Sequence, residues 1–560
     1  MKGMFPIAHV AIVRRFPRTK GVFDYAIPEG LAVQAGSFVR VPFGKRVLDG
    51  VILSLSKHTL AKSLKLVAHV YDDPPLSKND LEFYRALSKH TYQSLASIFH
   101  AAIPERPKRA HAYTHTDVGH APLRIRKDYI ASIQKAVKFL DTTTYADIAV
   151  LSDTVSEAIV VSALQTHEGP VRIVCPDYAT LERMHRVLSH RRVMRYIANQ
   201  PKTEHWDTYV HARFGTHDVL LTMRIGMLVP PPEGVTTFVV QSSSRDFRQD
   251  DQNPHYDTTW CLQYFKKQRN ASVYSFDVLP RIEDRPVNLD LWRPAQLRIL
   301  VDLSHSLHKY GLSETLVSAI ERISPTKLFV VYHNRLGVSR LMTCKTCDFR
   351  WMCALCHRPY RVEESGFVCR TCHITQELPT ACLNCHGNDL SSKGLGLKRL
   401  AQRLKNQFPD RNVEAIQAGN PLPNYGIAVV TETVWYQPIP PSLSGIAIVS
   451  LEHLFTHTGF DSQFHAYRTV RRLCGIASDR QIPIIIQAWD ASLLSEAMQP
   501  TRVLVEHEQA IRKTLGYPPF MTHVTVRNTK AGDKKIYRFP LEHVDETLSQ
   551  LPPIFDINVR

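Results

Sequence analysis

The chain has 560 residues and a mass of 63.8 kDa, which is enough for about three or four domains. Its composition, 44% hydrophobic and 22% charged, is typical of a globular protein and excludes a disordered or fibrous chain. The formal net charge is +17, so a polyanion such as nucleic acid is the first partner to expect. No apolar run approaches the roughly 18 residues that cross a bilayer, and no signal peptide is visible. We therefore expect a cytoplasmic protein with no membrane partner.

Residues 1–109 form the first predicted domain, and residues 110–129 form a linker without apolar periodicity. The domain carries 17 Lys and Arg against 8 Asp and Glu. Short β-branched runs separated by Pro and Gly turns predict a small β-rich module. One helical segment is expected near residues 80–99. The predicted strands are residues 9–13, 23–25, 37–41 and 50–53.

From residue 130 onward, buried strands alternate with helical segments, a pattern typical of parallel sheets with crossover helices. Two clusters of strands flank a cysteine-rich block, which favours two α/β lobes over one large sheet. The predicted strands are residues 148–151, 171–174, 219–221, 237–240, 328–331, 427–430, 446–449 and 482–486. The predicted boundaries are 130–290 for the first lobe, 291–343 and 387–495 for the second, 344–386 for the cysteine block and 496–560 for a shortened C-terminal domain.

Eight of the 11 cysteines lie between Cys344 and Cys385, in four Cys-x-x-Cys pairs. One such pair supplies half of a tetrahedral zinc site, so four pairs predict two closed, structural zinc ions. Twelve residues separate the second pair from the third, which is enough for a hairpin and favours a nested arrangement. Sequential pairing stays open, and redox motifs or an iron–sulfur cluster explain four regular pairs less well. The nested sets are Cys344, Cys347, Cys382 and Cys385 for one ion, and Cys353, Cys356, Cys369 and Cys372 for the other.

Several segments in order resemble the PriA family of bacterial replication restart helicases, also called primosomal protein N′. They include FDYAIPEGLAVQAGSFVRVPFGKR at residues 23–46, LFVVYHNRLGVSRLMTCKTC at 328–347 and LGYPPF at 515–520. The resemblance implies a small β-rich N-terminal DNA-binding domain and two RecA-like parallel α/β lobes of a superfamily 2 helicase. It also implies a double four-cysteine zinc module, with nested pairing, inserted in the second lobe.

The resemblance further implies that the N-terminal domain binds the 3′ end of a nascent DNA strand at a stalled fork. An aromatic side chain can stack on a base, a carboxylate can accept a hydrogen bond from a 3′-hydroxyl, and a lysine can meet a phosphate. Phe23 and Tyr25 could instead be ordinary strand residues that share one face. The residues that match the family's pocket are Phe23, Asp24, Tyr25, Gly44 and Lys65.

The family hydrolyses ATP, yet the residues that this chemistry needs are missing at three places. The strand at 148–151 is followed by Ser152-Asp153-Thr154, with no glycine between Gly119 and Gly169 to form a phosphate loop. The magnesium-binding acidic box is replaced by the sequence Gln-Ser-Ser-Ser at residues 241–244. The arginine fingers are replaced at residues 475–479, although Arg480 follows directly. We expect no functional ATP or magnesium site and no catalytic residues.

The sequence therefore favours a DNA-binding replication restart protein that recognises forked or branched DNA and recruits primosome and single-strand-binding proteins. It would be nucleoid-associated and would act without ATP hydrolysis or strand separation. Two alternatives stay open. One is a divergent but active ATP-dependent 3′-5′ DNA helicase, and the other is a zinc-dependent scaffold without a direct DNA role.

Overall fold

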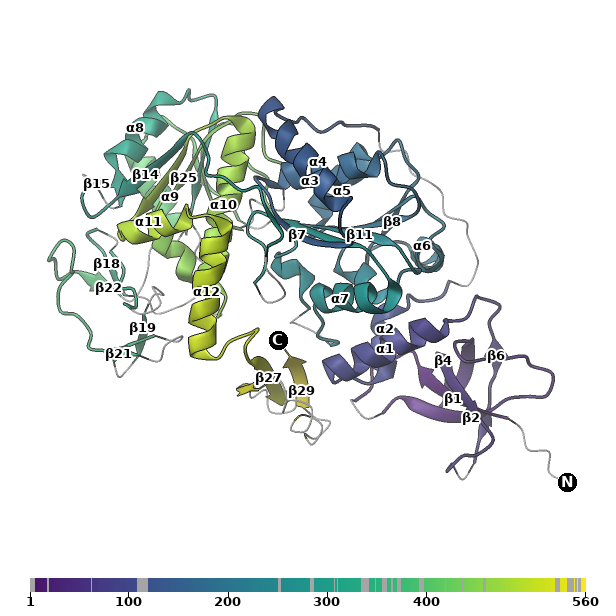
Figure 1. The fold of residues 1–560 in the computed structure, drawn as a ribbon. Coiled ribbons are helices and arrows are strands. Elements are labelled where there is room, and N and C mark those ends of the chain that lie inside the picture. The colour runs from purple at the N-terminus through teal and green to yellow at the C-terminus, as the bar shows by residue number, and fades with distance from the viewer. Residues whose placement is uncertain are drawn as a thin grey trace.

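The computed structural model describes residues 6–17, 20–61, 63–107, 119–249, 253–282, 287–306, 308–309, 311–333, 342–347, 349–354, 360–363, 366–369, 374–391, 397–417, 419–432, 434, 437–456, 460–528, 534–540, 548, 551 and 555–559. Two α/β lobes lie side by side, with the N-terminal domain below the first lobe (Figure 1). The C-terminal strands lie between that domain and the second lobe. No helix within these ranges has both the length and the apolar character needed to cross a bilayer.

The N-terminal domain is built on a six-stranded, largely antiparallel sheet in the order β5-β2-β1-β4-β3-β6. Alternate residues of its strands face a buried core that includes Val10, Tyr25 and Val39. A two-residue turn joins β3 to β4, and its first residue, Gly44, has φ +60°, which glycine adopts without a Cβ penalty. The strands are β1 Ile7–Ile12, β2 Val22–Ala26, β3 Phe38–Phe43, β4 Arg46–Ser56, β5 Lys65–Leu66 and β6 His69–Val70.

Two helices follow this sheet, α1 (Lys78–Thr91) and α2 (Leu95–Ala102). The prediction of one helical segment near residues 80–99 is therefore wrong. Tyr92 adopts a left-handed conformation, φ 53°, which ends α1. The side chain of Ser94 then accepts a hydrogen bond from the Ser97 backbone N–H and starts a new helix.

The first lobe has a seven-stranded sheet in the order β13-β7-β12-β11-β8-β10-β9, and every neighbouring pair is parallel. Its strands are buried and rich in β-branched residues, as expected when helices cover both faces. The strands are β7 Tyr145–Ala149, β8 Val171–Val174, β9 Val193–Tyr196, β10 Val219–Thr222, β11 Thr236–Val240, β12 Val273–Asp277 and β13 Leu289–Asp290. The helices are α3 Ile130–Leu140, α4 Asp153–Leu164, α5 Tyr178–Val187, α6 Lys202–Phe214 and α7 Thr258–Arg269.

The second lobe has a six-stranded parallel sheet in the order β14-β26-β25-β17-β24-β23. The prediction of two parallel α/β lobes is confirmed. The strands are β14 Arg298–Asp302, β17 Leu328–Tyr332, β23 Val413–Ala415, β24 Gly426–Val430, β25 Leu443–Ile448 and β26 Ile484–Ala488. The helices are α8 Glu314–Arg322, α9 Leu397–Gln407, α10 Ser462–Arg480 and α11 Ala491–Ala497.

The C-terminal part returns the chain to the N-terminal domain. Helix α12 (Thr501–Leu515) leads to an antiparallel sheet in the order β28-β27-β29, formed by Lys534–Phe539, Thr522–Asn528 and Phe555–Val559. Tyr92, at the end of α1, packs against the small core of this sheet, which is Val524, Val526, Leu548 and Ile557. Figure 1 shows the C-terminus beside α1.

The N-terminal domain shares one hydrophobic core with the first lobe. On α1, Phe83 packs against Tyr264 and Phe265 of α7, with ring centroids 5.3 and 5.0 Å apart. The guanidinium group of Arg106 lies between the rings of Tyr71 and Trp206, at 3.8 and 4.1 Å from their centroids. Burial of so much aromatic surface fixes the domain against the lobe.

A buried ionic contact joins the same two parts. Asp80 of α1 accepts hydrogen bonds from Arg269 at 2.7 Å and from Arg213 at 3.4 Å. All three side chains are less than a tenth exposed. Asp80 also accepts from the Ser77 backbone N–H, so its carboxylate caps α1 as well as binding the lobe.

Candidate functional site

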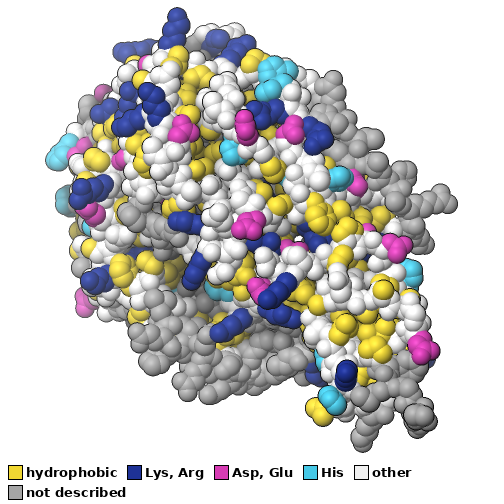
Figure 2. Space-filling model, turned by 45° about the vertical axis from the view of Figure 1, so that its right-hand side comes forward, with side chains coloured by type: hydrophobic (Ala, Val, Ile, Leu, Met, Phe, Trp, Pro, Cys, Tyr) yellow, Lys and Arg dark blue, Asp and Glu magenta, His cyan; other side chains and the backbone are white. Residues whose placement is uncertain are grey.

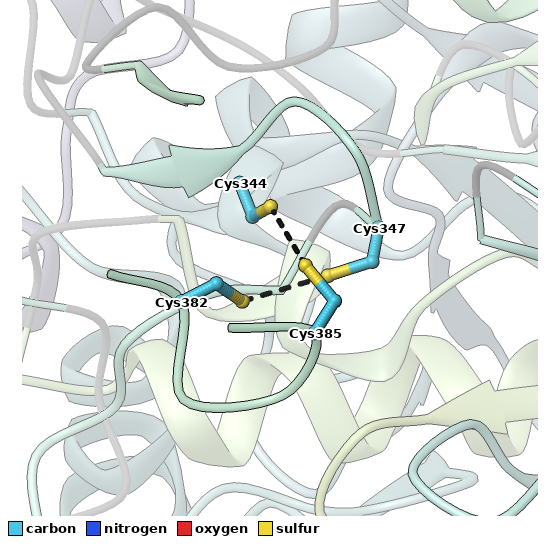
Figure 3. A group of neighbouring side chains, drawn as sticks. All are labelled: Cys344, Cys347, Cys382 and Cys385. Carbon is cyan, nitrogen blue, oxygen red and sulfur yellow. Dashed lines mark hydrogen bonds between the residues drawn. The ribbon is translucent and has the colours of Figure 1, made fainter. Parts of the chain in front are cut away.

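The four outer cysteines of the cysteine block meet at one point. Each of these two Cys-x-x-Cys pairs lies on a tight turn, here called a knuckle. The knuckle with Cys344 and Cys347 faces the knuckle with Cys382 and Cys385, and Figure 3 shows the four sulfurs turned toward a common centre. The ligand atoms all lie within 4.8 Å of one another. The Sγ–Sγ distances are 3.5 Å for Cys344–Cys385 and 3.6 Å for Cys347–Cys382. A tetrahedral zinc with Zn–S bonds of about 2.3 Å requires sulfur separations of about 3.8 Å, so the residues fit a metal ion.

Local backbone structure holds this centre in place. Cys344 ends the short strand β18 (Thr343–Cys344), which pairs with β22 (Leu390–Ser391). The Cys382 carbonyl accepts a hydrogen bond from the His386 N–H, and His386 adopts a left-handed φ of 55°. These contacts close the second knuckle without a ligand from His386. The four thiols leave no position for water or substrate, which is the arrangement of a structural site.

The second set of cysteines is described only in part. Cys353 and Cys369 are buried together in a small core with Trp351, Tyr360 and Phe367. Cys356 and Cys372, which were predicted to complete this set, lie outside the described residues. Their assignment to a second zinc ion stays a prediction.

The residues predicted to form a DNA 3′-end pocket lie on neighbouring parts of the N-terminal sheet, but they do not all share one face of it. Strand β2 carries Phe23, Asp24 and Tyr25, and its partner β5 places Lys65 in register with Tyr25. The Tyr25 hydroxyl donates to the Pro42 carbonyl at 3.3 Å, beside the turn that contains Gly44. The pairing of β2 with β5 thus brings Lys65 to residues about 40 positions earlier in the chain.

The two faces of β2 are different. Phe23 packs with Phe16 and Phe43, with ring centroids 5.8 and 5.1 Å away, and the Tyr25 side chain is only 4% exposed. Both aromatic residues therefore contribute to the core of the domain. Asp24 lies on the opposite face, where its carboxylate contacts His9 and Thr59. Sequence reasoning did not identify either partner of Asp24.

The place expected for a phosphate loop holds a short connection instead. Strand β7 ends at Ala149 and α4 begins at Asp153, so only residues 150–152 join them. A phosphate-binding loop of the G-x-x-x-x-G-K-[ST] type needs eight residues. The N-terminus of α4 is capped by the side chain of Ser152, and Asp153 occupies its first turn. The Ser152 and Asp153 side chains thus occupy the N-terminus of α4, the part of a helix that would otherwise attract a phosphate.

Three arginines of α10 fill the space between the lobes. Arg472 forms ion pairs with Asp153 at 3.2 Å and with Asp277 at 3.7 Å. Arg468 donates to the Leu279 carbonyl at 2.9 Å, and Arg471 donates to the Val278 carbonyl at 3.2 Å. We call Arg468, Arg471 and Arg472 the α10 arginine row. The 468, 471, 472 spacing places them on one helix face, but their partners in the first lobe could not be inferred from the sequence.

The region expected to hold arginine fingers also contacts the first lobe. Asp479 accepts a hydrogen bond from Ser152 Oγ at 2.8 Å. A Cβ atom on Gly475 would lie 3.0 Å from the Ser152 side chain, so a larger residue there would press against this part of the first lobe. Arg480 points elsewhere and donates to the Ile439 and Pro440 carbonyls of its own lobe.

Two buried carboxylates at this interface, those of Asp153 and Asp479, have raised pKa values. Burial raises the pKa of Asp479 to about 6. Burial also raises the pKa of Asp153 to about 6; the nearby Asp277 acts in the same direction, and Arg472 opposes it. A site that collects acids in this way disfavours a polyphosphate.

The residues at 241–244 provide no magnesium ligands of the usual anionic kind. Gln241 has φ 53° and donates through Nε2 to the Thr180 hydroxyl at 3.4 Å. The Ser243 hydroxyl donates to the Leu279 carbonyl at 3.0 Å. These side chains therefore bind neighbouring protein atoms.

A cavity of about 160 Å³ lies where the described parts of the lobes meet. It is smaller than the roughly 300 Å³ at which ligand pockets usually begin. Asp128, in its wall, accepts hydrogen bonds from Arg126 and Arg293. The lining also includes Tyr129 and Leu151 of the first lobe and Ala477, Ser478 and Gln481 of the second.

Comparison with known proteins identifies relatives across much of the chain. Residues 9–104 match the PriA 3′ DNA-binding domain. The replication restart protein PriA of Rickettsia conorii is 22% identical over 436 residues, which are 70% of this chain and 64% of that protein. The replication restart protein PriA of Haemophilus influenzae is 21% identical over 254 residues, 41% of this chain and 34% of that protein. The chain therefore spans less than two thirds of the length of these relatives.

The similarity to solved structures is lower. The structure of S. cerevisiae Dbp5 bound to RNA and ADP BeF3 is 10% identical, covers 79% of this chain and 98% of its own, and has a TM-score of 0.37.

Proposed function

We propose, from the premise that the chain belongs to the PriA family of replication restart proteins, that it binds forked or branched DNA and acts without ATP hydrolysis. The N-terminal domain would recognise the 3′ end of the nascent strand through the site around Asp24. The two lobes would serve as a rigid body that positions bound DNA and recruits primosome and single-strand-binding proteins. A nucleoid-associated location in the cytoplasm follows from this role.

One observation supports function without ATP hydrolysis most strongly: protein side chains occupy the space between the two lobes. A three-residue connection precedes α4, Asp153 lies in the first turn of that helix, and Asp479 contacts the capping residue Ser152. The α10 arginine row contacts Asp153, Asp277 and two carbonyls of the first lobe. An arginine that pairs with a protein carboxylate is not available to stabilise charge on a transferring phosphoryl group.

The charge of the chain supports the DNA-binding part. The N-terminal 109 residues carry nine more basic than acidic side chains. Figure 2 shows several Lys and Arg side chains, with some Asp and Glu side chains among them, in the middle of one face of the molecule. Contacts between such side chains and phosphates release counterions, so the affinity should fall steeply as the salt concentration rises.

The cysteine centre would have a structural role. When bound by Cys344, Cys347, Cys382 and Cys385, a zinc ion supplies cross-links between the two knuckles. Buried Cys344, Cys347 and Cys382 belong to the same hydrophobic cluster as Leu400 and Leu404 of α9. The metal would therefore stabilise the second lobe rather than take part in a reaction.

Two assays on the full chain test this proposal. In a DNA-stimulated ATPase assay, we expect phosphate release no faster than in a protein-free control. Release that scales with protein concentration and is blocked by a non-hydrolysable ATP analogue would favour an active helicase. At one fixed salt concentration, we expect forks with a free 3′-hydroxyl to bind more tightly than forks with a blocked 3′ end. Equal binding of both forks and of linear duplex would contradict recognition of the 3′ end.

A further inference from the structure

The carboxylate of Asp24 is held on both of its oxygens by residues from other segments of the N-terminal domain. His9 lies opposite Asp24 in the register of β1 and β2, and its Nδ1 is 2.6 Å from Asp24 Oδ1. Because a carboxylate only accepts hydrogen bonds, this ring nitrogen must carry the proton. The Thr59 hydroxyl donates to the other oxygen, Oδ2. The orientation of the carboxylate is therefore fixed before any ligand arrives.

Asp24 retains capacity for a further hydrogen bond. A carboxylate has about four acceptor positions, and His9 and Thr59 use two of them. The Asp24 side chain is 22% exposed and the His9 side chain 31%. A hydroxyl group from solvent or from a ligand can thus reach the carboxylate while both protein partners stay in place.

Thr59 belongs to a loop that follows β4 and precedes β5. The Thr59 hydroxyl also accepts a hydrogen bond from the Ala61 N–H at 3.0 Å. The His58 backbone N–H donates a hydrogen bond to the Ser56 hydroxyl, also at 3.0 Å. Leu60 stands between these anchored residues with a relative exposure of 103%. No other large hydrophobic side chain of the described residues is as exposed. Leu60 directly follows Thr59 in the chain. The hydrogen bond from Thr59 to Asp24 therefore anchors the residue next to this fully exposed leucine.

We propose that His9, Thr59 and Leu60 complete a 3′-end site around Asp24. His9 and Thr59 are positioning residues that orient the carboxylate to accept from a terminal 3′-hydroxyl. Leu60 gives apolar contact to the terminal sugar or base, and exposed Lys57 and Lys65 lie on either side of the loop for the neighbouring phosphates. The ligand class is a nucleic acid strand with a free 3′-hydroxyl. This inference rests on the proposed 3′-end function and assigns it residues beyond the five predicted ones.

The test measures the binding of the full chain to two labelled duplexes with recessed 3′ ends, one ending in a 3′-hydroxyl and one in a 3′-deoxynucleotide. We expect the unaltered protein to prefer the hydroxyl by about tenfold, as for a hydrogen bond to a charged group. T59V and H9A should reduce this preference below about twofold, because each frees the carboxylate to rotate. Their affinity for the 3′-deoxy duplex should stay within about twofold of the unaltered protein, as expected for positioning residues.

Conservative variants separate positioning from a general loss of structure. T59S keeps the hydroxyl and H9N keeps a donor near the place of Nδ1, so both should retain the preference. L60A should weaken binding to both duplexes equally, by about threefold, because it removes apolar contact. The control L55A removes a leucine of β4 that is 45% exposed and should change neither affinity.

The outcomes distinguish this inference from the function on which it rests. If the unaltered protein binds both duplexes equally, recognition of the 3′-hydroxyl fails altogether. If the preference exists and D24N abolishes it, yet T59V and H9A retain it, the 3′-end function stands and the roles given to His9 and Thr59 are wrong. If L60A and L55A behave alike, Leu60 makes no contact with DNA.

Discussion

Asp479 of α10 and Ser152 at the start of α4 form a hydrogen bond of 2.8 Å that joins the two lobes. Here the side chains meet directly, and the α10 arginine row adds contacts on the same side of the interface. These contacts join the two lobes directly through side chains.

The substitution D479N should increase stability at neutral pH. Burial raises the pKa of Asp479 to about 6, above its unfolded value near 4. The folded state therefore binds the proton more tightly, and stability falls as the pH rises from about 4 to about 6. Asparagine keeps an oxygen for Ser152 but cannot ionise. At pH 7.5 we expect unfolding to cost about 1 kcal/mol more in the variant, since solvent screening reduces the full effect. Thermal melts at pH 4 should show no difference, and a variant that is less stable at pH 7.5 would contradict this account.

The substitution R472A should loosen the contact between the lobes. It removes the ion pairs with Asp153 and Asp277 and leaves two carboxylates near each other without their cation. We expect a loss of about 2 to 3 kcal/mol in unfolding free energy and a larger radius of gyration in small-angle scattering. R502A is the matched control, because Arg502 pairs with Glu506 while 85% exposed, and it should have no measurable effect. An unchanged radius of gyration in R472A would mean that other contacts suffice to close the lobes.

Metal analysis should find two zinc ions per chain. C347S should remove the ion of the described centre and lower the zinc content by about one, since the thiolates bind it jointly. C474S alters a buried cysteine outside the block and should keep both ions. Chelation should lower the melting temperature of the unaltered protein more than that of C347S. One zinc ion per chain in the unaltered protein would show that the second set does not bind metal.

The substitution D80A should destabilise the join between the N-terminal domain and the first lobe. It leaves Arg213 and Arg269 buried without their carboxylate, which typically costs about 3 to 5 kcal/mol. E82A on the same helix is the control, because Glu82 is half exposed and lies 4.0 Å from Lys78. Denaturant titrations followed by tryptophan fluorescence would report both changes, since Trp206 lies at this interface. Equal stability of the two variants would refute a structural role for the buried contact.

Much of the fold could be predicted because buried parallel strands leave strong sequence signals. The predicted strands at 328–331 and 482–486 correspond to β17 and β26, respectively. Strand β12 was not predicted, because Ser275 and Asp277 interrupt its apolar pattern. The helix break at Tyr92 was not predicted either, because a tyrosine seldom adopts a left-handed conformation.

The candidate sites also differ in how much of each could be predicted from the sequence. Cysteine spacing favoured the nested centre at Cys344, Cys347, Cys382 and Cys385 but left sequential pairing open, and the structure brings these four thiols together. The partners of Asp24 could not be predicted, since strand register brings in His9 and a loop contact brings in Thr59. The contact of Arg468 with Leu279 spans 189 positions and exists only because two lobes pack together.

The core that the N-terminal domain shares with the first lobe affects how the chain can be divided in experiments. Residues 1–107 and 119–560, produced separately, would each expose aromatic surface that is normally covered, and each would tend to aggregate. Produced together as two polypeptides, they should reassemble, because the rings of Phe83 and Phe265 and the charge of Asp80 need no covalent link to find their partners. Fragments that stay soluble and apart would mean that the peptide connection, rather than the packed surface, keeps the halves in place.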